Sequence, residues 1–150
     1  MNKSTKPIAV IDIDGTIAKV GKRADLLRKN PIDWEQFYAD SFDDDPIEDV
    51  CDFVRMLRPA CEIFFCTSRS EMVRHKTQNW LKKHLGMEPK DYTLIMRPCN
   101  DDRPDYISKI DCFESETTQE ERERVKFVIE DSMCVAWSWR EAGYRTYQVS

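Results

Sequence analysis

An apolar run near the start of the sequence ends on two acidic residues, and this feature limits the folds open to the chain. Residues 8–16 read Ile-Ala-Val-Ile-Asp-Ile-Asp-Gly-Thr, which places Asp12 and Asp14 two positions apart. Side chains at this spacing on a strand point the same way, so the carboxylates repel each other unless they share a cation or a proton. Gly15 permits the sharp turn that must follow. The segment predicts a buried strand that leads to a functional site; a polar strand end that caps the next helix is the alternative.

The rest of the sequence alternates apolar runs with amphipathic runs, a pattern typical of a parallel sheet with crossover helices. We expect an α/β fold with helices on both faces of the sheet and functional residues at the carboxyl ends of its strands. The expected strands are residues 7–12, 61–66, 93–96, 126–130 and 145–149, and the expected helices are residues 47–58, 71–85, 104–123 and 132–142. Gly86 and Gly143 follow two of these helices, as carboxy-terminal caps do.

The length of 150 residues favours a single domain over residues 1–150. Residues 17–46 form a small insertion after the first strand, which we expect to hold a short helix bearing Trp34, Phe37 and Tyr38. This insertion is too short to make a separate lid domain. The site is therefore expected to be open.

Composition excludes several classes of protein. The net charge of −5 argues against a broad nucleic-acid surface, although it does not exclude recognition of one phosphate end. The apolar stretch after Pro7 is interrupted by Asp12 and is too short for a signal peptide or a membrane span. The six cysteines include no Cys-x-x-Cys pair, so a zinc site is not expected, and free thiols fit a reducing cytoplasm.

The Asp-x-Asp-Gly-Thr motif after an apolar strand resembles the nucleophile motif of the haloacid dehalogenase (HAD) phosphohydrolase superfamily. The resemblance implies a Rossmann-like fold with strand order 3-2-1-4-5 and a magnesium cofactor. It also implies that Asp12 is the nucleophile and a magnesium ligand. Asp14 would be the general acid and base, with its backbone carbonyl on the metal.

Two further segments carry the other parts of the family pattern. Residues 64–70, Phe-Phe-Cys-Thr-Ser-Arg-Ser, place Thr67 and Ser68 at a strand end, where the start of a helix would add backbone N–H groups. Thr67 resembles the family's phosphate-binding hydroxyl residue, and Arg69 matches a phosphate-contacting arginine of one branch of the family. A helix cap at Thr67 and an ordinary surface arginine are the alternatives.

Residues 128–132, Val-Ile-Glu-Asp-Ser, form the last acid-ended strand. The family pattern implies that Asp131 is a second magnesium carboxylate and that Glu130 is a supporting or alternative ligand; a helix cap at Asp131 is the other interpretation. Lys109, on the helix before this strand, would neutralise the crowded carboxylates. Lys126 is a weaker candidate because it enters the strand itself.

Residues 97–112 are similar to a segment of the 3′-phosphatase domain of phage-type polynucleotide kinase/phosphatase. This resemblance implies that Arg97 and Lys109 join Thr67 and Arg69 around the phosphate. Ser68 stands where that group has glycine, and Glu130 where it has aspartate. The kinase half of that protein carries a phosphate-binding P-loop. The segment from Gly15 to Lys22 does not match it, because five residues rather than four separate its two glycines.

We therefore expect a magnesium-dependent phosphomonoesterase that removes a 3′-phosphate from a DNA or RNA end through an aspartyl-phosphate. A phosphatase of mononucleotides or small phosphometabolites is the alternative, and a receiver-type signalling domain is a third hypothesis. A separate kinase or ligase partner and a homo-oligomer both stay open. Trp34 or Tyr38 would stack on a terminal base, unless these rings pack inside the insertion.

Overall fold

The computed structural model describes residues 4–149, whose five strands form one parallel sheet in the order β3-β2-β1-β4-β5. The order is the one that the family resemblance implied. The strands are β1 (Ile8–Ile11), β2 (Glu62–Ser70), β3 (Tyr92–Arg97), β4 (Val125–Glu130) and β5 (Thr146–Gln148). The α-helices are α1 (Trp34–Ala39), α2 (Glu48–Leu57), α3 (Arg74–Leu85), α4 (Asp105–Glu116), α5 (Gln119–Arg124) and α6 (Met133–Glu141).

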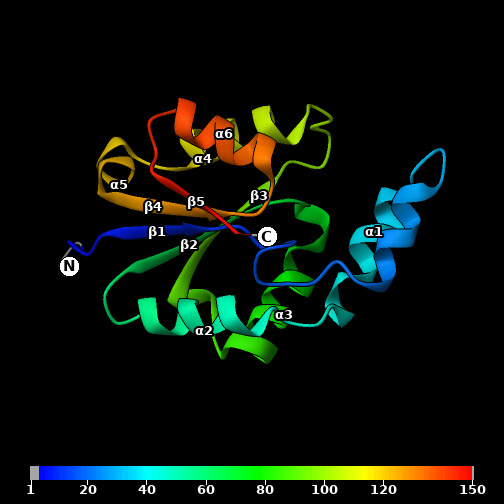
Figure 1. Ribbon diagram of the computed structural model, residues 1–150, viewed down its shortest axis with the longest axis horizontal. Helices are drawn as coiled ribbons and strands as arrows, with labels where there is room; N and C mark the ends of the chain where they lie inside the picture. The colour runs from blue at the N-terminus through cyan, green and yellow to red at the C-terminus, as the bar shows by residue number, and fades with distance from the viewer. Residues whose placement is uncertain (1–3, 150) are drawn as a thin grey trace.

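Helices cover both faces of the sheet, with α2 and α3 on one side and α4 and α6 on the other (Figure 1). Each face has its own buried cluster because side chains alternate along a strand. Ala9 and Ile11 of β1 belong to the cluster under α2 and α3, whereas Ile8 and Val10 belong to the cluster under α4 and α6. The strands are therefore apolar at successive positions because both faces of the sheet are buried.

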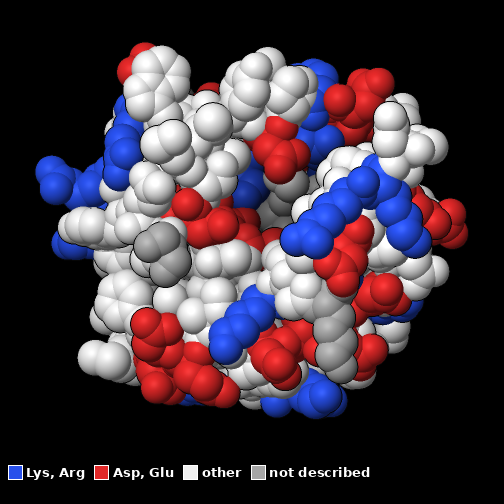
Figure 2. Space-filling view, turned by 45° about the vertical axis from the view of Figure 1, so that its right-hand side comes forward, with Lys and Arg blue, Asp and Glu red and all other residues white. Residues whose placement is uncertain are grey.

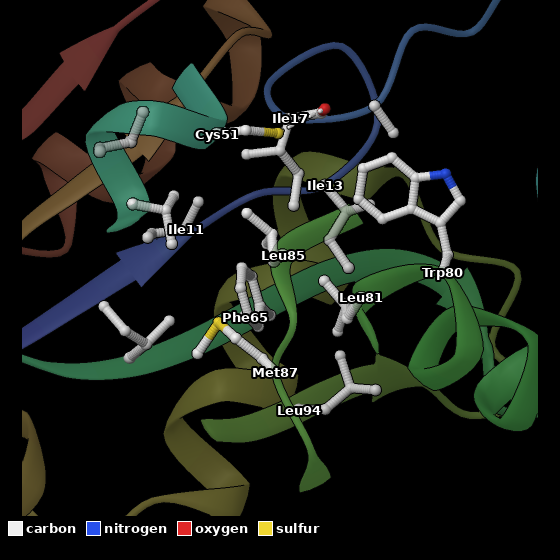
Figure 3. Close-up of a cluster of buried hydrophobic side chains, with 14 of the residues drawn as sticks. Ile11, Ile13, Ile17, Cys51, Phe65, Trp80, Leu81, Leu85, Met87 and Leu94 are labelled. Atoms are coloured by element: carbon white, nitrogen blue, oxygen red, sulfur yellow. Dashed lines mark hydrogen bonds between the residues drawn. The ribbon is translucent and has the colours of Figure 1, made fainter. Parts of the chain in front are cut away.

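The cluster under α2 and α3 is centred on Phe65 of β2 and on Trp80 and Leu81 of α3 (Figure 3). All three side chains are buried, and each burial of this kind contributes about 1.5–3 kcal/mol. The indole nitrogen of Trp80 points away from this core and donates a hydrogen bond of 2.9 Å to the backbone oxygen of Asp44. This bond ties the end of the insertion to the core.

The insertion lies beyond the carboxyl end of β1, apart from the two helical layers (Figure 1). It contains three short helical segments: η1 (Lys22–Arg28), the aromatic-bearing helix α1, and η2 (Asp40–Asp43). The hydroxyl of Tyr38 donates a hydrogen bond of 3.2 Å to the backbone oxygen of Ser68, which fastens α1 over the end of β2.

Two expected boundaries, one of a helix and one of a strand, are wrong. The helix expected over 104–123 is two helices, because Thr117 adopts an extended conformation and Thr118 caps α5 in a capping box with Glu121. The Thr117 hydroxyl also donates to the Phe113 carbonyl, which satisfies one of the free acceptors at the end of α4.

The second error concerns the strand expected over 61–66. β2 continues to Ser70, with a register shift against β3 between Cys66 and Ser70. The short helix η3 (Glu71–Val73) follows, and α3 starts only at Arg74. The backbone N–H groups at the start of a helix therefore do not lie at Thr67, and Ser70 is the residue that caps η3.

The caps expected after two helices are confirmed. Gly86 ends α3 in the left-handed conformation, with φ of 65°, and Gly143 has φ of 98° just after α6. Within residues 4–149, none of the helices combines the length and the apolar character that crossing a membrane requires.

Candidate active site

Asp12 follows β1 directly and lies at the centre of the site. Its Oδ1 accepts a hydrogen bond of 2.7 Å from Nζ of Lys109, and its Oδ2 accepts one of 2.8 Å from the hydroxyl of Thr16. The side chain is almost completely buried. Burial, reinforced by the nearby charge of Glu130, raises the pKa of Asp12 to about 7.

The turn after β1 brings Asp131 against Asp12. Gly15 has φ of 84°, and a Cβ atom at this position would lie 2.1 Å from Oδ2 of Asp131. The Thr16 hydroxyl lies 3.4 Å from Oδ1 of Asp131, so it sits between the two carboxylates. Burial and the neighbouring Asp12 carboxylate raise the pKa of Asp131 to about 6. The glycine is required both by the backbone conformation and by the approach of this acid.

Lys109 of α4 connects Asp12 with Glu130. Its Nζ donates to Oε2 of Glu130 at 2.9 Å as well as to Asp12. Burial alone would lower the pKa of Lys109, but the charges of Asp12 and Glu130 outweigh it and hold the pKa well above the usual value. The other oxygen of Glu130, Oε1, accepts hydrogen bonds from the backbone N–H groups of Asp131 and Ser132. Both oxygens of Glu130 are therefore engaged.

This group of residues has the composition of a divalent cation site. One carboxylate oxygen from each of Asp12, Glu130 and Asp131 lies within 4.8 Å of the others. When all three carboxylates are ionised, their charge exceeds that of the Lys109 ammonium by two, which matches one divalent cation. Oxygen ligands of this kind suit Mg²⁺, which keeps several waters and needs only one or two carboxylates. Ser132 is the residue that caps α6, so Asp131 is not held as a helix cap.

We call Asp12, Glu130 and Asp131 the acidic group. Asp14 lies outside it, in a separate cluster of ion pairs. Arg69 donates to both of its oxygens, at 3.0 and 2.7 Å, and Arg23 also donates to Oδ1. Burial alone would raise the pKa of Asp14, but Arg69 and Arg23 outweigh it and lower the pKa. Asp44 accepts three further hydrogen bonds from Arg23. Two guanidinium groups thus balance two carboxylates.

The residues predicted to hold phosphate are divided between different places. Thr67 and Ser68 lie in the wall of the same cavity as Asp12 and Lys109. The buried hydroxyl of Ser68 has no hydrogen-bond partner within the described part of the chain. Arg69 is fully buried, its guanidinium donates hydrogen bonds to Asp14 and Thr77, and it also lies 3.6 Å from Asp44. Arg97 lies in a neighbouring cavity, where its guanidinium donates to Asp105.

Two residues of the site were missed by the sequence analysis. Thr16 belongs to the first motif, and its place directly after the turn was the available signal. Arg23 lies in a basic stretch that gave no sign of burial, because only the tertiary structure turns it inward onto Asp14 and Asp44.

The residues around Asp12 line a cavity of about 250 Å³, which we call the acidic cavity. It lies at the carboxyl ends of the strands, and the insertion forms its outer wall through Trp34, Phe37 and Tyr38. Seen from this side, the molecule is hollowed near its centre, and acidic side chains gather at the margin of the hollow (Figure 2). Asp12, Glu130 and Asp131 all line this cavity, so a ligand that enters it can contact the acidic group.

Comparison with known families shows to which family this chain belongs. A model of the polynucleotide kinase PNKP phosphatase domain matches residues 6–150. The chain belongs to this family. The PNKP phosphatase domain is an HAD domain, so both resemblances noted in the sequence are confirmed.

A viral protein is similar in sequence to this chain. The protein, from Autographa californica nuclear polyhedrosis virus, is named as a bifunctional polynucleotide kinase/RNA ligase and is 30% identical over 138 residues. The match covers 90% of this chain but only 18% of the viral protein. The chain therefore spans less than a fifth of that relative.

Solved structures show the same fold. A chain of the Pnkp1/Rnl/Hen1 RNA repair complex matches with a TM-score of 0.77 at 24% identity, over 99% of this chain and 44% of that chain. YfnB of Bacillus subtilis, named as an HAD hydrolase and solved with bound magnesium, matches with a TM-score of 0.68 at 12% identity, over 97% of this chain and 89% of that chain. The PNKP phosphatase domain described here thus has the HAD fold.

Proposed function

We propose that this domain is a magnesium-dependent phosphomonoesterase that removes 3′-phosphates from polynucleotide ends through an aspartyl-phosphate on Asp12. The observation that carries the proposal is the state of Asp12. Its carboxylate lines the acidic cavity, accepts hydrogen bonds from Lys109 and Thr16, and belongs to an acidic group whose charge a divalent cation would neutralise. A nucleophile for phosphorus needs this combination of fixed position and nearby cation.

In the first step, an oxygen of Asp12 attacks phosphorus and the bond from phosphorus to the sugar O3′ breaks, with a proton delivered to O3′ from Asp14. In the second step, water attacks the acyl phosphate, Asp14 accepts the proton of the water, and Asp12 is regenerated as phosphate leaves. Bound magnesium would neutralise charge between the phosphate oxygens and the carboxylates of Asp12 and Asp131. Glu130 would position Lys109, because both of its oxygens are already engaged.

The arginine contacts of Asp14 favour the ionised carboxylate, which is the form that the second step needs. Protonation of the leaving O3′ requires the neutral form. Substrate binding must therefore loosen the contact of Asp14 with Arg23 or Arg69 before the first step. General acid or base catalysis by such a group is worth about 10²–10⁴-fold in rate.

For the phosphate itself, we propose Thr67 and Ser68 as the nearest hydroxyl donors. The Ser68 hydroxyl has no hydrogen-bond partner among residues 4–149, which supports this role, because a buried donor without a partner is costly until a ligand accepts from it. Arg69 would act mainly by holding Asp14. Arg97 would reach the phosphate only if its pairing with Asp105 changes.

The polynucleotide substrate and a kinase or ligase partner are supported by the relatives, which are named for polynucleotide kinase and RNA ligase activities and for an RNA repair complex. The family assignment points the same way. A phosphatase domain in such a setting would prepare a 3′-hydroxyl end for joining.

The test compares phosphate release from a 3′-phosphorylated oligonucleotide, its 5′-phosphorylated twin and a 3′-mononucleotide, with magnesium and with EDTA. We expect magnesium-dependent release from the first substrate and little from the other two. The Asp12→Asn variant should be folded and inactive. Equal rates on all three substrates would instead support a phosphatase of small molecules. A phosphoenzyme that persists for minutes would support a receiver-type domain.

A further inference from the structure

A second cavity, of about 490 Å³, adjoins the acidic cavity, and we call it the aromatic cavity. Its walls come from α1, from the end of β2 and the start of η3, and from the loop between β3 and α4. Trp34, Tyr38 and Asp105 line both cavities. A ligand with a phosphate in the acidic cavity could thus place a neighbouring group in the aromatic cavity.

Trp34 is the main apolar feature of this shared wall. Half of its surface is exposed, although it opens a helix that packs over the site. Its ring stacks on that of Tyr38, with centroids 6.1 Å apart and planes inclined by 24°. The Tyr38 hydroxyl is fixed to β2, so the pair forms a firm platform. A large exposed indole backed by a second ring is suited to stacking on a flat aromatic ligand.

The charges around the aromatic cavity disfavour a second phosphate. Its walls carry the carboxylates Glu35, Asp101, Asp102 and Asp105 against the guanidinium groups of Arg97 and Arg103. Both arginines are already paired, Arg97 with Asp105 at 2.6 Å and Arg103 with Asp101 at 2.9 Å. An uncharged ring is therefore a better occupant than an anion.

The same walls can recognise the polar edge of such a ring. Nε of Arg97 is buried and has no hydrogen-bond acceptor among residues 4–149, so a shift of this cavity-lining side chain would offer a donor to a ring nitrogen or carbonyl. The carboxylates can accept from exocyclic amino groups, as acidic side chains do from cytosine. A nucleobase has both kinds of group on one edge.

We propose that the aromatic cavity binds the base of the 3′-terminal nucleotide, unstacked from its neighbour and laid on Trp34, while its 3′-phosphate occupies the acidic cavity. This inference rests on the proposed function and adds a subsite to it. Because one sugar joins the base to the 3′-phosphate, that sugar would lie against the residues that line both cavities, Trp34, Tyr38 and Asp105. Because every base can stack on an aromatic ring, the subsite recognises that a terminal base is present and does not select which base it is.

The test uses two oligonucleotides with a 3′-terminal phosphate, one with a terminal base and one whose terminal nucleotide is abasic. We expect wild-type kcat/KM to be about 10-fold or more higher on the end that carries the base. Trp34→Ala should remove most of this preference, and Trp34→Phe should keep much of it. Trp137→Ala is the matched control, since this exposed tryptophan of α6 lies outside both cavities and should leave the preference unchanged.

The outcomes separate the subsite from the function on which it rests. If wild type acts equally on both ends, or if Trp34→Ala reduces kcat/KM equally on both, the base subsite is overturned while the 3′-phosphatase proposal stands. If wild type releases phosphate from neither end but hydrolyses p-nitrophenyl phosphate, the 3′-phosphatase proposal is overturned and the subsite with it.

Discussion

Nζ of Lys109 lies 2.7 Å from Oδ1 of Asp12, and both side chains are buried. The two residues are 97 positions apart in the sequence and come from α4 and the end of β1. This ammonium pairs with two of the three carboxylates of the acidic group, Asp12 and Glu130. The pair therefore links the stability of the fold to the chemistry of the site.

Removal of this cation should destabilise the protein. Without magnesium, Lys109→Met leaves buried carboxylates uncompensated, and we expect a loss of about 3–5 kcal/mol in the free energy of unfolding. Urea denaturation in EDTA measures it. The Asp12→Asn/Lys109→Met double variant should recover part of the loss, because it removes one of the charges left unpaired. Strict additivity of the two single changes would show that the pair is not coupled.

A side chain at position 15 should disturb the acidic group more than it disturbs the fold. Gly15→Ala introduces both backbone strain, which costs about 1–3 kcal/mol, and a clash with Asp131. We expect a higher magnesium concentration for half-maximal activity and a lower kcat. Gly143→Ala is the control, since Gly143 also has positive φ but has open space around it. If both variants shift the magnesium requirement equally, the contact of Gly15 with Asp131 has no functional role.

The metal-free protein should lose stability as the pH rises from about 5 to 8. Asp12, with a pKa of about 7, and Asp131, with a pKa of about 6, hold protons in the folded state at pH values where the unfolded chain has lost them. A carboxyl with a raised pKa favours folding below its unfolded pKa, and that contribution is lost as the pH passes the folded pKa. The lowered pKa of Asp14 acts only in the acid range below this window.

Urea denaturation at several pH values in EDTA measures this slope. Asp12→Asn should flatten it, because the variant cannot ionise at that position. Magnesium should reverse it, since the cation binds the ionised carboxylates and stabilises the fold most at higher pH. A wild-type slope identical to that of Asp12→Asn would show that Asp12 does not titrate in this range.

Arg23 should control the chemistry through Asp14. Asp14→Asn is expected to lower kcat by about 10²–10⁴-fold. Arg23→Gln removes a contact that favours the ionised Asp14, which is the form that hydrolysis of the acyl phosphate needs, so it should slow that step and lower kcat. The two changes together should cost less than the product of the single effects. Arg28→Gln, at an exposed position in the same segment, is the control. Unchanged kcat in a folded Arg23→Gln variant would separate Arg23 from the function of Asp14.

Much of the fold could be predicted because local patterns carry the information. Apolar runs bounded by acids or hydroxyls place strand ends, and a parallel sheet brings those ends to one edge. Asp12 and Asp131 therefore lie around one cavity, as their positions in the sequence indicated. Thr67 lines it too, although β2 continues to Ser70, and it lies where the pairing with β3 is interrupted. The break at Thr117 was missed because the amphipathic pattern continues through it, whereas the hydrogen bonds of two threonines end one helix and start another.

The sequence by itself determined the order of strands and helices, the glycine turn after β1 and the gathering of acids at one edge of the sheet, because each depends on short-range spacing and alternation. Only the tertiary structure decided which charges pair. It enclosed Asp14 between Arg23 and Arg69, paired Lys109 with two carboxylates of the acidic group, and placed Trp34 between two cavities. Ion pairs and shared walls depend on distances between segments far apart in the chain, and no local pattern records those distances.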